Sequence, residues 1–187
     1  MDAAEKLPDR YTYADYCKWP ENERWELIDG EVYALATPTL GHQRIAGDVY
    51  VQLKDFLRNK PCEVFIAPVS VRLNADKGDD TVVEPDILVV CDSKKLEDGK
   101  GVVGAPDFIV EILSPSTSMH DKARKYRIYQ QAGVNEYWIV DPEDKLVTAF
   151  ILHDGKYSGV VFFHDDTAVP VKTLEGCTID LSEVFPE

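Results

Sequence analysis

The 187-residue sequence lacks the features that would place it in a membrane or in a cross-linked framework. It has no apolar run near the ~20 residues of a membrane-spanning helix, and its start, MDAAEKLPDRYTYADY, has no basic segment followed by an apolar one. We therefore expect a cytoplasmic protein with no membrane contact. No CxxC pair occurs among its cysteines, so we expect neither a zinc knuckle nor disulfides. We interpret all four as reduced thiols: Cys17, Cys62, Cys91 and Cys177.

Basic side chains are also scarce. The chain carries 34 acidic and 20 basic residues, a net charge of −14, whereas proteins that hold nucleic acid through phosphates usually show a basic face. The one dense basic run is KARKYR, which contains Lys122, Arg124, Lys125 and Arg127. This run is either a solvated helix face or a contact for nucleic acid, and for the second role the candidates are Lys122, Arg124 and Arg127.

The composition that is present fits one folded domain over residues 1–187. Hydrophobic residues make up 44% of the chain and charged residues 29%, which is enough apolar area to form a core. The first half predicts a short helix capped by Thr12 and ending at Pro20, a hairpin turning at Asp29-Gly30, and a long amphipathic helix over 40–59. A strand over VSVRLN and a loop over NADKGDD follow.

The second half predicts the centre of a sheet. EPDILVVCD and PDFIVEILSP are nearly continuous apolar runs, typical of strands covered on both faces, and the polar segment SKKLEDGKGVVGA connects them. A helix over 118–132 ends at Gly133, the strand EYWIVD follows, and residues 145–171 form alternating strands with turns at Asp154-Gly155 and Asp165-Asp166. The pattern indicates an α/β fold.

Acidic residues interrupt the two central strands. In PDFIVEILSP, Glu111 points to the same face as Ile109 and Leu113, and an ionised carboxylate there needs a proton, a cation or a metal. Asp86 begins the neighbouring strand, and Glu84 lies just before it. Two such acids can converge on Mg²⁺ or Mn²⁺. The alternatives are a turn-capping role for Asp86 and a buried salt bridge for Glu111.

The helix after Glu111 can supply a cation. Its residues 121, 125, 128 and 132 share a face, so Lys125 is partly directed inward, one turn from Asp121. The pair could equally be a surface ion pair. Tyr126 and Tyr129 form an adjoining stripe that favours aromatic core packing, with Lys122 extending to water.

These residues resemble a known family. The runs WELIDGEVYAL, GHQRI, EPDILVV, PDFIVEILSPST and DKARKYRIYQQAGVNEYWIVDP are similar to the Uma-type family of restriction endonucleases, within the PD-(D/E)xK nuclease superfamily. The resemblance extends from about Tyr13 to the C-terminal strands. It implies a restriction-endonuclease-like core: a central mixed β-sheet flanked by helices, with an N-terminal hairpin and additional C-terminal antiparallel strands.

The resemblance also implies a site. Asp86 and Glu111 would be the motif carboxylates, and the backbone carbonyl of Ile112 would join them on Mg²⁺ or Mn²⁺. The sequence departs from the motif at Leu113, where the superfamily has lysine, so Lys125, or else Lys122, would take the catalytic role. Among other family positions, Glu26 would be a catalytic residue as a metal or water ligand, or else a cross-strand charge partner. His42 and Asp121 would lie behind the metal ligands, with His42 as a hydrogen-bond donor.

The implied activity is Mg²⁺-dependent hydrolysis of nucleic acid, DNA more than RNA. A homodimer is expected because cutting both strands of a duplex needs two sites, and a further protein partner stays open. The acidic surface and Leu113 favour instead an inactive binding or assembly module. A glycosidase with two carboxylates is a third hypothesis, which the separation of Trp19 and Trp25 from the two acids along the sequence makes weaker.

Overall fold

Two β-sheets form most of the fold. The computed structural model describes residues 10–20, 22–114 and 119–185. The larger sheet has six strands in the order β11-β10-β9-β8-β6-β3, of which β8 and β9 are parallel and the other neighbours antiparallel. Its strands are β3 (Glu63–Ile66), β6 (Ile87–Val90), β8 (Phe108–Ile112), β9 (Glu136–Asp141), β10 (Leu146–His153) and β11 (Lys156–Phe163). The sheet is therefore mixed and includes the predicted C-terminal antiparallel strands.

The smaller sheet carries the N-terminal hairpin. Its order is β2-β1-β5-β4-β7, and the hairpin turns at Asp29 and Gly30 with φ of 50° and 77°, as the Asp-Gly pair predicts. Short helix α1 (Tyr13–Tyr16) precedes it. The strands are β1 (Trp25–Ile28), β2 (Glu31–Ala34), β4 (Val71–Arg72), β5 (Val82–Val83) and β7 (Val102–Val103).

Two predictions in this region were wrong in detail. The strand expected over VSVRLN is reduced to the two residues of β4, and the expected polar connection after β6 contains the 3₁₀ helix η1 (Ser93–Leu96) and strand β7. β7 pairs in parallel with β4. Such short strands are too brief to show a period in the sequence, and their pairing is set by the loops around them.

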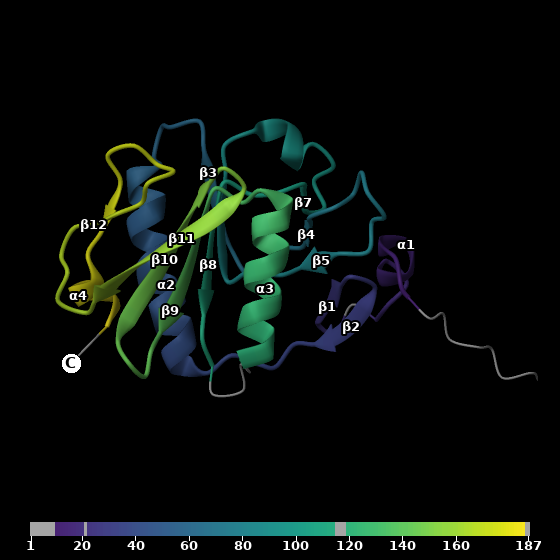
Figure 1. Cartoon of the computed structure of the whole chain (residues 1–187), viewed down its shortest axis with the longest axis horizontal. Helices are drawn as coiled ribbons and strands as arrows, with labels where there is room; N and C mark the ends of the chain where they lie inside the picture. Colours follow the sequence, from purple (N-terminus) through teal and green to yellow (C-terminus); the bar gives the residue numbers. More distant parts are fainter. Residues whose placement is uncertain (1–9, 21, 115–118, 186–187) are drawn as a thin grey trace, which may run out of the picture.

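Two helices cover opposite faces of the six-stranded sheet (Figure 1). Helix α2 (Leu40–Phe56) packs on one face together with β12 (Val169–Pro170), β13 (Thr178–Ile179) and α4 (Leu181–Val184). Helix α3 (Met119–Ala132) lies on the other face and ends at Gly133, whose φ is 87°. Among the described residues, no helix has the length and apolar content to cross a bilayer.

The pleat of β8 divides its side chains as predicted. Phe108, Val110 and Ile112 belong to the apolar cluster under α2, whereas Ile109 belongs to the cluster under α3. Glu111 therefore points toward α3 and is 8% exposed. Burial of this strand on both faces brings a carboxylate into the protein interior.

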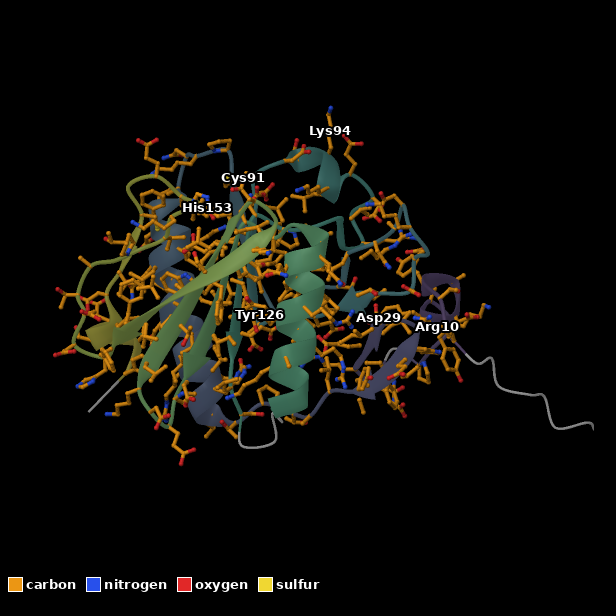
Figure 2. All side chains as sticks on the ribbon, in the orientation of Figure 1. Arg10, Asp29, Cys91, Lys94, Tyr126 and His153 are labelled. Atoms are coloured by element: carbon orange, nitrogen blue, oxygen red, sulfur yellow. A yellow bond between two sulfur atoms is a disulfide. The ribbon has the colours of Figure 1, made fainter. Side chains whose placement is uncertain are left out.

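The interpretation of all four cysteines as thiols was wrong, because Cys62 and Cys91 form a disulfide. Glu63 pairs with Val90 at one end of the β3–β6 ladder, and the two cysteines are the next residues outward, with Cα atoms 4.0 Å apart. Figure 2 shows Cys91 near η1, at the end of the sheet away from the start of α3. Only strand register brings together residues that are 29 positions apart, so cysteine spacing did not reveal the pair.

Candidate functional site

A cleft of about 460 Å³ opens at the end of the sheet where β8 ends and β6 begins. Residues from β1, β2, the start of α2, the segment before β6, β8 and α3 line it. Its charged groups are four acids and four bases, together with His42: Glu26, Glu84, Asp86, Glu111, Arg24, Lys122, Arg124 and Lys125. The two predicted carboxylates and the predicted lysine thus face one space.

Asp86 is fixed at the start of β6 by two donors. Its Oδ2 accepts a hydrogen bond from the amide of Ile112 at 2.8 Å and lies 3.1 Å from Nε2 of His42. The hydrogen bond to Asp86 raises the pKa of His42. His42 sits in the first turn of α2, where its amide donates to the hydroxyl of Thr39, and its buried Nδ1 has no hydrogen-bond partner. His42 is therefore placed to orient Asp86.

Glu111 is buried and contacts both a cation and a phenol. Its Oε1 lies 3.0 Å from Nζ of Lys125 and accepts a hydrogen bond from the hydroxyl of Tyr129 at 2.6 Å. Burial raises the pKa of Glu111 to about 7, although Lys125 pulls it down. Near neutral pH this carboxyl can therefore hold either a proton or a cation.

Lys125 bridges two carboxylates. The Nζ of Lys125 contacts Glu111 and also lies 3.0 Å from Oε1 of Glu26. The same Oε1 accepts a hydrogen bond from the backbone amide of Glu84 at 3.0 Å. Glu84 in turn pairs with Arg24 at 2.8 Å. The salt bridge considered as the alternative for Glu111 is therefore present. Glu26 contacts Lys125 on α3 and the Glu84 amide in the segment before β6, in place of the cross-strand charge partner considered for it. These ion pairs and hydrogen bonds attach the β1–β2 hairpin to the wall of the cleft.

The basic run of α3 divides between two surroundings. Lys122 and Arg124 line the cleft, and the guanidinium of Arg124 lies 4.0 Å from the ring centre of Tyr33 on β2. Arg127 instead pairs with Asp29 at the hairpin turn. Figure 2 shows Asp29 beside Arg10, whose side chain donates to the Asp29 carbonyl. The side chain of Asp121 and most of the SPST motif lie outside the described part of the chain.

Three residues at the site were not identified from the sequence: Arg24 and Tyr33 line the cleft, and the buried Tyr129 contacts Glu111. Tyr129 was assigned to aromatic packing, which it also provides against Tyr137, but its position one turn after Lys125 could have indicated its contact with Glu111. Arg24 and Tyr33 lie on the hairpin, and no local pattern predicts that the hairpin packs against the cleft. Their roles become visible only in the fold.

The donor set of the cleft suits a hard divalent cation held partly by water. Within the described residues, no group of three or more His, Cys, Asp or Glu side chains gathers to hold a metal ion. Mg²⁺, however, commonly uses one or two carboxylates and keeps several water ligands. Asp86 and Glu111 line the same cleft, and the amide of Ile112, the residue after Glu111, donates a hydrogen bond to the Asp86 carboxylate. The residues present therefore fit a cation of this class.

Sequence comparison connects the chain to a described family. Residues 13–182 match the family model described as "Putative restriction endonuclease". Two uncharacterized Synechocystis proteins are similar: slr1290 is 26% identical over 62% of this chain and 60% of its own length, and sll1609 is 25% identical over 70% and 74%. The chain thus spans less than two thirds of slr1290 in this match.

A solved structure shares the fold. The crystal structure described as "a putative nuclease belonging to DUF820", from Anabaena variabilis, covers 94% of this chain and 97% of its own, with a TM-score of 0.77 and 21% identity. At that identity the similarity establishes the architecture alone. The mixed α/β arrangement predicted from the sequence is therefore confirmed.

Proposed function

We propose that this chain, which belongs to the restriction-endonuclease family whose model matches residues 13–182, is a divalent-metal-dependent nuclease that hydrolyses phosphodiester bonds of DNA. The observation that supports the proposal best is the arrangement of Asp86, Glu111 and Lys125 around one cleft. Two hard oxygen ligands beside a buried ammonium group supply the charges that phosphodiester hydrolysis needs.

Each residue of the cleft has a defined task in this proposal. Asp86 and Glu111, with the carbonyl of Ile112, would hold Mg²⁺ or Mn²⁺, which would polarise the phosphate and acidify a bound water. His42 and the Ile112 amide keep the Asp86 carboxylate aimed at the cleft. Lys125 stabilises negative charge on the reacting phosphate, and Glu26 holds its ammonium group beside the cleft until substrate binds.

The lysine is positioned differently from the superfamily motif. Leu113 occupies the motif position, and Lys125 reaches Glu111 from α3 instead. Because Nζ of Lys125 lies 3.0 Å from two carboxylates, it must shift toward the phosphate when metal and substrate bind. A Lys125 that stays bound to both acids favours the second candidate, an inactive module that keeps the nuclease fold.

Nucleic acid approaches a chain of net charge −14, so binding depends on local cations. Lys122 and Arg124 line the cleft, and a metal on Asp86 and Glu111 would offset the nearby acids. We expect weak binding without metal and a strong dependence on salt. A homodimer and a further protein partner belong to the proposal as well.

A metal titration read by melting temperature, followed by DNA cleavage, tests the assignment. Mg²⁺ or Mn²⁺ should raise the melting temperature of the parent and of Lys125→Ala, but not that of Asp86→Ala or Glu111→Gln. Cleavage of plasmid and oligonucleotide DNA should disappear in all three variants. Glu143→Gln, a change in the turn after β9, is the matched control and should behave like the parent.

Each outcome has a clear meaning. Cleavage by Asp86→Ala at the parental rate would refute the site. A parent that binds metal but cleaves neither DNA nor RNA would support the binding module. Cleavage of RNA but not DNA would assign RNA as the substrate and would leave the assignment of the site residues unchanged.

A further inference from the structure

Strand β11 leaves one edge of the six-stranded sheet open. It occupies the end of the strand order and pairs with β10 along all eight of its residues. From Tyr157 to Phe163 it carries no charge and no proline, the residues that usually protect an edge strand from pairing. Val160, Val161 and Phe163 are 52%, 47% and 55% exposed. This edge is therefore both apolar and uncovered by the described residues.

The hydrogen-bonding direction of each β11 residue can be assigned. The amide of Tyr157 donates to the side chain of Gln130, and that of Phe163 donates to Asp166, so neither is used toward β10. Since direction alternates along an antiparallel strand, the amides and carbonyls of Gly159 and Val161 also point away from β10. Side chains thus satisfy the amides at both ends of the edge, and its middle stays open.

We propose that β11 pairs with β11 of a second copy of this chain, in antiparallel register about a two-fold axis at Val160. In this register Gly159 of each copy faces Val161 of the other, and each facing pair exchanges two backbone hydrogen bonds. Val160 meets its own copy on the axis. The two sheets then join into one sheet of twelve strands, with an interface that is self-complementary as a two-fold dimer requires.

Side chains in the same register are complementary. Tyr157 and Phe163 face one another across the interface, and aromatic cross-strand pairs stabilise sheets. Lys156 at one end of β11 comes beside the turn of the second copy that carries Asp165 and Asp166. An apolar centre with opposite charges at its ends allows two molecules of high negative charge to associate.

The interface leaves the two clefts separate. An axis perpendicular to the sheet keeps both α3 helices on one face and places the clefts at opposite ends of the joined strands. Seven strand spacings of about 4.8 Å separate the two β8 strands, or roughly 34 Å. Neither cleft receives a residue from the other copy, so the proposal does not rest on nuclease activity.

Mass in solution tests the interface. Sedimentation equilibrium should give the mass of two chains rather than 21.1 kDa, and Val160→Lys, which places two ammonium groups on the axis, should give the mass of one chain. Val51→Lys, at a 56% exposed valine on α2, is the matched control and should stay dimeric. A parent of single-chain mass up to its solubility limit, or a dimeric Val160→Lys protein, would overturn the proposal.

Cross-linking tests the register without weakening the interface. In a Cys17→Ser background, which removes the exposed cysteine, Val160→Cys should form an interchain disulfide under mild oxidation, because facing Cα atoms of this pair type lie about 4.5 Å apart. Lys156→Cys should not, because its copy would lie eight residues away, about 27 Å. Equal cross-linking of the two variants would refute the register. Cleavage per chain by Val160→Lys should match the parent in any case where the parent cleaves.

Discussion

Glu111 and Glu136 are two buried carboxylates on the neighbouring parallel strands β8 and β9, and they are stabilised in opposite ways. Glu136 is fully buried and accepts hydrogen bonds from Nε1 of Trp138 and the amide of Thr173, each at 2.7 Å. Glu111 instead meets the ammonium group of Lys125 and lines the cleft. Burial raises the pKa of both carboxyls.

The difference separates a structural carboxylate from a candidate metal ligand. The donors around Glu136 are fixed neutral N–H groups that attach the segment before β13 to the sheet. The cation beside Glu111 is the ammonium group of the long Lys125 side chain. A metal ion can take its place next to the carboxylate. Burial of an acid in an apolar strand is therefore shared by the two sites, and only the cleft and the exchangeable cation distinguish Glu111.

The largest effect should follow removal of that cation. Lys125→Ala leaves Glu26 and Glu111 buried without their positive partner, which typically costs about 3–5 kcal/mol. Urea unfolding of the metal-free protein should show this loss. Lys122→Ala, a lysine on the same helix that is less buried, should change the unfolding free energy by less than about 1 kcal/mol. Equal losses would mean that the ion pairs contribute little.

A pH series should separate the two carboxylates next. The pKa of Glu111 rises from 4.5 to about 7 in the fold, so the folded state favours the protonated form. Its stabilising contribution is complete below pH 4.5 and is lost as the pH rises through 7, a change of about 3 kcal/mol in the metal-free protein. Glu111→Gln should remove this slope, and Glu136→Gln should remove a smaller one of the same sign.

The effect of a bound metal on the melting temperature gives a further test of the difference between Glu111 and Glu136. At pH 8 a divalent cation should raise the melting temperature of the parent and of Glu136→Gln, because both keep an ionised Glu111. Thermal melts with and without Mn²⁺ measure this. Two results would contradict the assignment of Glu111 as metal ligand and Glu136 as structural carboxylate. One is a Glu136→Gln protein whose melting temperature no longer rises with metal. The other is a larger loss of the pH dependence of stability in Glu136→Gln than in Glu111→Gln.

Much of the fold was predictable because its signals are local. The Asp-Gly hairpin, the period of α2 and the apolar runs of β6, β8 and β9 each depend on a few adjacent residues. The predicted end of α2 lay three residues too far, at Asn59 rather than Phe56. The disulfide and the β4–β7 pairing depend on register between distant segments, which no local pattern encodes.

The candidate site was predictable as a set of residues but not as a network. Alternation placed Glu111 inside and helical spacing turned Lys125 inward, yet the same reasoning applied to EYWIVD would have singled out Glu136 equally. Glu26 contacts Lys125 because the hairpin packs against α3, and Tyr129 contacts Glu111 because α3 packs against β8. Sequence therefore indicated which residue types need partners, and the fold supplied the partners.

The smallest effect concerns nucleic-acid binding at the two ends of the sheet. Arg124 lies at the Glu111 end, on the ring of Tyr33, whereas Lys172 is exposed beside the Glu136 site. If phosphates bind at the cleft, Arg124→Ala should weaken metal-supported DNA binding equally for unrelated sequences and lower the salt slope by about 1. Lys172→Ala should leave both unchanged. Fluorescence anisotropy across a salt series measures them, and a loss confined to Lys172→Ala would move the binding surface away from the cleft.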